Sequence, residues 1–121
     1  MTTYTVTVQN VDGGNKYFID GSRQLVLNLT EGNIYHFDWS AVGSHPLRFS
    51  STADGTHGGG SEYTSGVTVN GTTSTIIVPA GAPTLYYYCQ HHHGMGGELT
   101  TEAAPSGNAS GDPFVTPMFS F

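Results

Sequence analysis

The chain has 121 residues and a formal net charge of −6, and only 10% of its residues are Asp, Glu, Lys or Arg. This length fits a single domain, and the acidic balance argues against nucleic acid or an anionic membrane surface as a partner. The single cysteine excludes a disulfide within the chain, so the sequence lacks the framework of a small disulfide-stabilised secreted protein.

Hydrophobic and polar residues alternate along most of the chain, and no segment of helical length repeats with a period of 3.6 residues, so we expect strands. The first strand is TYTVTVQ, residues 3–9, in which Tyr4, Val6 and Val8 alternate with threonine. The second is RQLVLNLT, residues 23–30, which follows two Asp-Gly turn signals and has three leucines on one face.

The next two predicted strands are aromatic. In NIYHFDWS, residues 33–40, the aromatic side chains fall on one face of the strand. In HPLRFS, residues 45–50, His45 shares a face with Leu47 and Phe49. The pattern therefore places a histidine on the buried face, at the start of a strand.

Residues 51–66 have the composition of a loop. Residues 67–78 predict two short strands around the turn dipeptide Asn70-Gly71, and TLYYYC, residues 84–89, predicts the last strand of the core. About seven short strands at this spacing predict an all-β protein, an antiparallel sandwich with Greek-key connections.

The composition changes near residue 100. Residues 100–113 form a Gly, Pro and Ser-rich linker, and FVTPMFSF, residues 114–121, is apolar again. We therefore expect a sandwich over residues 1–99, followed over residues 100–121 by a linker and an apolar C-terminal arm. Such an arm is expected to dock on its own sandwich or on a neighbouring chain.

The stretch YYYCQHHHGMGG, residues 86–97, carries the residues suited to metal chemistry. Cys89, His92 and Met95 are each three residues apart, and His45 lies far upstream on the buried face of its own strand. Two imidazoles, a thiolate and a weak thioether are the donors of a blue-copper site. Zinc is one alternative, because imidazole also suits zinc, but zinc gains little from a thioether. A site that holds no metal and serves only as a polar cluster is another alternative.

The alternation of inward and outward side chains along a strand supports only part of this ligand set. Cys89 shares a face with Leu85 and Tyr87, so its sulfur is expected to point inward. The chain turns after Cys89, so parity cannot decide among the three histidines at 91–93, and only the spacing favours His92.

Two segments carry a resemblance to a known family. LYYYCQHHHGM, residues 85–95, and EGNIYHFDWSAVGSHPLRFS, residues 31–50, resemble the ligand loop and the first-ligand strand of copper-binding cupredoxins. The resemblance covers residues 20–98. It implies the cupredoxin fold, with His45, Cys89 and His92 as equatorial ligands and Met95 as the axial one. Pro46 follows the first ligand where many cupredoxins have Asn, so a hydrogen bond near the thiolate is in doubt.

A narrower resemblance involves residues 45–67 and 82–97, which are similar to cupredoxin-like domains in structural proteins of marine bacteriophage virions. It implies a virion location and a structural role, as a capsid decoration, fibre or tail protein. The partners would be other virion subunits or copies of the chain, reached through the C-terminal arm. The alternative is a free soluble blue-copper electron carrier, periplasmic or extracellular if a leader has been removed.

Several further expectations follow from what the sequence lacks. No segment reaches the ~18 apolar residues of a membrane span, and the N-terminus shows no signal peptide, so we expect a soluble protein that this route does not export. We expect that the protein is not an enzyme. The sulfur ligands of a single metal site leave no open coordination position on the metal for a substrate. His36 and His57 are expected to be plain surface residues.

Overall fold

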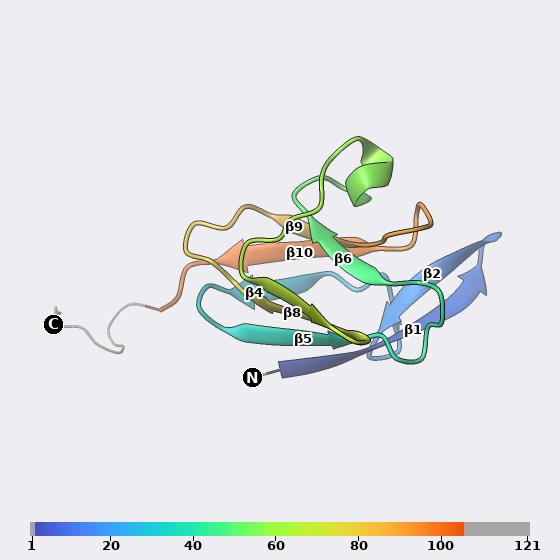
Figure 1. Cartoon of the computed structure of the whole chain (residues 1–121), viewed down its shortest axis with the longest axis horizontal. Coiled ribbons are helices and arrows are strands. Elements are labelled where there is room, and N and C mark those ends of the chain that lie inside the picture. Colours follow the sequence, from blue (N-terminus) through green and yellow to red (C-terminus); the bar gives the residue numbers. More distant parts are fainter. Residues whose placement is uncertain (1, 106–121) are drawn as a thin grey trace, which may run out of the picture.

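The computed structural model describes residues 2–105, and over these residues the chain forms an all-β sandwich of two sheets (Figure 1). One sheet has six strands in the order β3-β2-β1-β5-β8-β7, and the other has four in the order β4-β10-β9-β6. The elements are β1 (Thr2–Val11), β2 (Gly14–Ile19), β3 (Ser22–Arg23), β4 (Leu27–Thr30), β5 (Ile34–Asp38), β6 (Leu47–Ser50), the 3-10 helix η1 (Gly55–Gly58), β7 (Val67–Asn70), β8 (Thr73–Ile77), β9 (Leu85–Cys89) and β10 (Gly97–Glu102).

The all-β fold class is confirmed, with two differences from the sequence prediction. The described residues form ten strands rather than about seven, and β2, β3 and β10 are the ones that the pattern did not predict as strands. The sheets are mixed rather than antiparallel, because β1 pairs parallel with β5 and β4 pairs parallel with β10. Both parallel pairs join segments far apart in sequence, and local hydrophobic patterns carry no information on such pairing.

Strand β10 places the end of the sandwich later in the chain than the sequence predicts. The composition predicted a linker from residue 100, but β10 continues to Glu102 and pairs along β4 from Leu99 opposite Leu27 to Glu102 opposite Thr30. The sandwich therefore extends three residues beyond the predicted boundary. The predicted apolar arm, residues 114–121, lies outside the described residues, and so does the linker from residue 106 on.

The core lies between the two sheets and is built from the inward positions of their strands. Its fully or almost fully buried members are Val6, Tyr17, Ile19, Leu29, Phe37, Leu47, Phe49, Ile76, Val78, Leu85, Tyr87, Cys89, Met95 and Leu99.

One buried polar residue links the sheets. The Ser74 hydroxyl, on β8, accepts a hydrogen bond from the Trp39 indole at 2.9 Å and donates to the Leu47 carbonyl, on β6, at 2.6 Å.

The segment over residues 51–66, expected to be a loop, contains η1 and covers part of the outer face of the four-stranded sheet. η1 stands over β6 and β9 (Figure 1). A Cβ added to Gly55 would lie 2.5 Å from the Tyr88 ring, so the turn packs directly on that side chain. Tyr88 is therefore buried although it faces away from the core. Within the described residues, no helix is long and apolar enough to cross a membrane.

Candidate metal centre

The pairing of β6 with β9 brings two distant segments together. The two strands are antiparallel, with Leu47 opposite Cys89, and the Gln90 amide extends the ladder by donating to the Pro46 carbonyl at 3.0 Å. His45 lies two residues before β6, and Cys89 is the last residue of β9. This register places His45 beside the end of β9, and the Cys89 side chain points inward there.

Three of the four predicted ligands converge at this point. The Cys89 Sγ atom lies 3.6 Å from Nδ1 of His45 and 3.5 Å from Nδ1 of His92. The two imidazole rings have centroids 4.5 Å apart, and one donor atom from each of the three residues lies within 4.8 Å of the others. The three residues form a group that could hold a metal ion.

The donor distances suit one small metal ion between the sulfur and each nitrogen. A tetrahedral metal with bonds of about 2.3 Å to sulfur and about 2.0–2.1 Å to imidazole nitrogen separates these donors by about 3.5 Å. The observed separations of 3.6 and 3.5 Å match this value. Both sulfur–nitrogen separations are therefore compatible with one metal ion bound between these donors.

The fourth predicted ligand, Met95, lies at the same end of the sandwich and is only 1% exposed. It lines a cavity of about 510 Å³ together with His92. Its main-chain carbonyl accepts a hydrogen bond from the Tyr17 amide at 2.9 Å, which fixes the backbone of the loop against β2. Its role as the axial ligand stays a prediction.

The environment of His45 favours the form that binds metal. Burial lowers the pKa of His45, and the nearby His92 and His91 lower it further. A lower pKa favours the neutral imidazole, which is the ligand form. The Tyr17 hydroxyl donates to the His45 carbonyl at 2.6 Å, and burial followed by the neighbouring Cys89 thiol raises the pKa of Tyr17, so the hydroxyl keeps its proton.

Side chains from the six-stranded sheet hold the chain between Cys89 and Gly96, the ligand loop. Lys16 Nζ donates to the Gly94 carbonyl at 3.0 Å. Gln24 Nε2 donates to the Gly96 carbonyl at 2.8 Å and lies 3.3 Å from that of Gly94. Sequence reasoning missed Lys16, Tyr17 and Gln24, because contacts with main-chain atoms leave no spacing motif.

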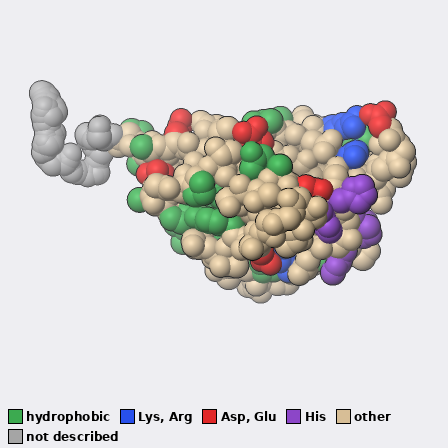
Figure 2. Space-filling view, turned by 90° about the horizontal axis from the view of Figure 1, so that it is seen from above, with side chains coloured by type: hydrophobic (Ala, Val, Ile, Leu, Met, Phe, Trp, Pro, Cys, Tyr) green, Lys and Arg blue, Asp and Glu red, His purple; other side chains and the backbone are tan. Residues whose placement is uncertain are grey.

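The histidines gather at this end of the molecule, as Figure 2 shows. His92 is exposed although its Nδ1 faces the sulfur, and His91 and His93 are exposed beside it. His36 bonds through Nδ1 to the Thr75 hydroxyl at 2.6 Å, away from the ligand loop. His57, expected to be a plain surface residue, is exposed but also bonds through Nε2 to the Cys89 carbonyl at 2.8 Å.

Comparison with known proteins adds no family to this description. The sequence matches no protein-family model, and no curated protein matches it. The cupredoxin resemblance therefore stays a prediction from the sequence, and the argument for a metal centre depends on the geometry of His45, Cys89 and His92.

Proposed function

We propose that this protein is a non-enzymatic, cupredoxin-like module with a type 1 copper-like site formed by His45, Cys89, His92 and Met95. The observation that carries the proposal is the convergence of two imidazole nitrogens on the one sulfur, at 3.6 and 3.5 Å. Only one cysteine exists in the chain, and it stands at this point.

The donor set favours copper over zinc. Thiolate and thioether are soft ligands that select copper, and a structural zinc site would require four strong ligands. Met95, buried at the same end, adds the soft fourth donor that zinc would not use. Copper, when bound, supplies one-electron redox chemistry. These donors fill its coordination positions, which supports a role other than substrate turnover.

We further propose that the module is a structural component of a phage virion, as a capsid decoration, fibre or tail protein. The support is the similarity of residues 45–67 and 82–97 to cupredoxin-like domains of virion structural proteins. These two segments contact each other through η1 and β9, so the similarity concerns one connected part of the fold. The partners would be other virion subunits or copies of the chain, bound through residues 114–121.

One observation favours the alternative, a free electron carrier. His92 is exposed at the mouth of the cavity beside Met95, so an electron could pass from a redox partner through its ring. Both functions use the same metal site and differ in what binds at the surface.

The test of the metal site is a visible spectrum after addition of copper(II) to the full chain. We expect an intense thiolate-to-copper band at about 600 nm or about 450 nm, because a cysteine sulfur bound to copper(II) absorbs there. Cys89→Ser and His92→Ala should abolish the band, whereas His93→Ala, which removes the neighbouring exposed imidazole, should keep it. Absence of the band in the parent protein would refute the copper proposal.

Sedimentation of the copper-loaded full chain separates the two roles. A structural component that assembles with copies of itself should form defined oligomers at micromolar concentration. A carrier should remain a monomer whose band bleaches reversibly with a mild reductant such as ascorbate. A monomer with this redox behaviour would exclude assembly with copies of the chain, favour the carrier and leave the copper site intact.

A further inference from the structure

The turn DGTHGGG, residues 54–60, contacts the ligand loop at two points, and we call it the clamp turn. The Asp54 carboxylate accepts a hydrogen bond from the Gly94 amide at 2.9 Å. His57 Nε2 lies 2.8 Å from the Cys89 carbonyl, and because a carbonyl oxygen can only accept, Nε2 carries the proton and donates. One turn therefore binds the ligand loop near both of its ends.

The residues of the clamp turn fit this position closely. Gly55, at φ +56°, lies against the Tyr88 ring with no room for a Cβ, and Gly58 and Gly60 are equally confined by the main and side chains of residues 52–53. The His57 ring also meets Tyr88 edge-on, with centroids 6.2 Å apart. The glycines allow the turn to approach β9, and this brings the imidazole to the end of the strand.

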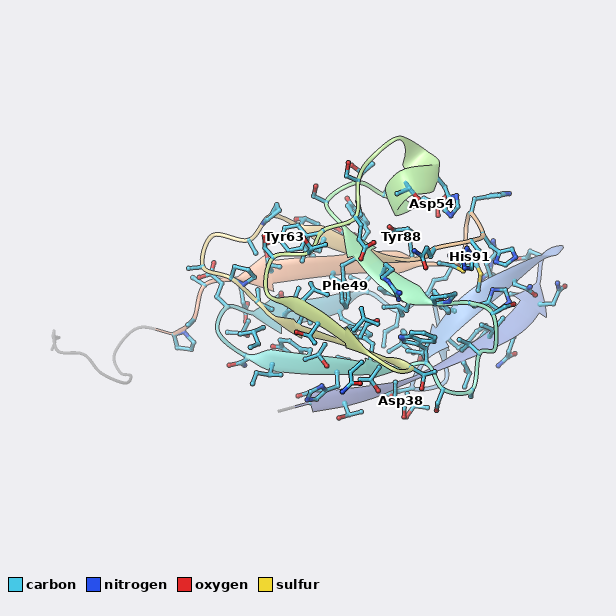
Figure 3. All side chains as sticks on the ribbon, viewed as in Figure 1. Asp38, Phe49, Asp54, Tyr63, Tyr88 and His91 are labelled. Carbon is cyan, nitrogen blue, oxygen red and sulfur yellow. The ribbon has the colours of Figure 1, made fainter. Side chains whose placement is uncertain are left out.

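The conformation and contacts of Asp54 also indicate that the clamp turn holds the ligand loop. It precedes η1 in the left-handed conformation, at φ +62°, which is unfavourable for a residue other than glycine. Its side chain makes no capping bond to η1 and instead reaches Gly94 in the ligand loop. Figure 3 shows Asp54 on the turn above the ligand loop, near His91.

We propose that Asp54 and His57 are positioning residues of the metal centre, holding the ligand loop so that Cys89 and His92 meet His45 before any metal binds. The inference rests on the proposed metal function of the site, but its first test needs no metal. Hydrogen bonds that orient ligands from outside the coordination sphere typically change metal affinity by 10–100-fold when removed. The clamp turn makes two such bonds, one at each end of the loop.

The first test measures opening of the loop in the metal-free full chain. Cys89 is fully buried, so its reaction with a thiol reagent requires the loop to open. We expect the double variant Asp54→Ala/His57→Ala to react at least about 10-fold faster than the parent, because both hydrogen bonds that hold the loop closed are lost. The Gly94 amide should also exchange faster with deuterium.

The chain provides a matched control in Asp20→Ala/His36→Ala. Asp20 also has a left-handed φ, of +49°, and accepts a main-chain hydrogen bond from Thr5 at 2.8 Å, while His36 bonds to Thr75. Neither control residue touches the ligand loop in these bonds. Equal thiol reactivity and Gly94 exchange in the clamp and control variants would overturn the inference.

The second test uses copper and a conservative pair. Asp54→Asn/His57→Gln keeps an acceptor for Gly94 and a donor for the Cys89 carbonyl, and it should retain the parent affinity. Asp54→Ala/His57→Ala should bind copper(II) 10–100-fold more weakly, with a shifted thiolate band. Unchanged affinity and band in the alanine variant would overturn the positioning role. If the parent shows no copper band, the copper proposal fails, and the metal-free measurements still decide the role of the clamp turn.

Discussion

Substitution of Gly96 by alanine should damage the candidate metal centre without changing any of the proposed ligands. A Cβ at this position would lie 1.6 Å from the Tyr87 carbonyl oxygen and 2.9 Å from the Tyr88 Cα. Both atoms belong to the main chain of β9, which the core holds in place. The ligand loop would therefore have to move away by about 1.8 Å, the difference between 1.6 Å and an ordinary contact of 3.4 Å.

Such a shift removes two hydrogen bonds, from Gln24 to the Gly96 carbonyl and from the Tyr17 amide to the Met95 carbonyl. Overpacking costs about 1–3 kcal/mol and each lost bond about 0.5–1.5 kcal/mol, so we expect a destabilisation of about 2–6 kcal/mol. Urea unfolding of the metal-free protein, followed by the fluorescence of buried Trp39, measures this change. The copper band should also weaken.

Gly14→Ala is the matched control for this substitution. Gly14 lies at the same end of the sandwich, has no left-handed φ, and would place its Cβ no closer than 3.6 Å to the end of the Lys16 side chain. It should change the stability by less than about 1 kcal/mol. The reasoning is refuted if Gly96→Ala and Gly14→Ala unfold at the same urea concentration.

Three further substitutions test the surroundings of the site. Ser74→Ala leaves the buried Trp39 indole N–H without its acceptor, whereas the Leu47 carbonyl still accepts from Arg48 at 3.1 Å, so urea unfolding should show a loss of about 1–3 kcal/mol. Tyr17→Phe removes the donor to the His45 carbonyl, so the copper band should shift, and an unchanged band would contradict a role for the hydroxyl. Hydrogen bonds from Ser40 lower the pKa of Asp38 below 3.8, so this carboxylate stabilises the fold above that pH and the contribution disappears on acidification below it. Asp38→Asn should therefore make stability less dependent on pH below about pH 4, which acid titration of the unfolding transition measures.

Part of the candidate site could be predicted from local features of the sequence, whereas the approach of His45 to Cys89 depends on the pairing of β6 with β9. The alternation of Leu85, Tyr87 and Cys89 gives the direction of the sulfur, and the spacing from Cys89 selects His92. His45 follows from its place on the buried face of an aromatic strand. The structure brings His45, Cys89 and His92 together, and the inward direction of Cys89 follows from the period of two along its strand.

The features that the sequence does not predict depend on pairing between distant strands or on contacts with main-chain atoms. The pattern does not predict NKYFI, residues 15–19, as a strand because two Asp-Gly turns flank it, although it forms most of β2 and contains Tyr17. β10 was missed because GELTTE is mostly polar, and its pairing with β4 bridges about 70 residues. The hydrogen bond of His57 to the Cys89 carbonyl also has no sequence signature, since any residue could supply that carbonyl.

The hydrogen bonds that Lys16, Gln24 and the clamp turn make with the ligand loop all end on its main-chain atoms. The exposed side chains at positions 90, 91 and 93 take no part in these bonds. Substitutions there can change the charge, shape and chemical character of the surface around His45, Cys89 and His92 while these three residues keep their places. The loop is thus a ready scaffold for diversification, in which selection or protein engineering could vary what this end of the molecule recognises independently of the proposed metal site.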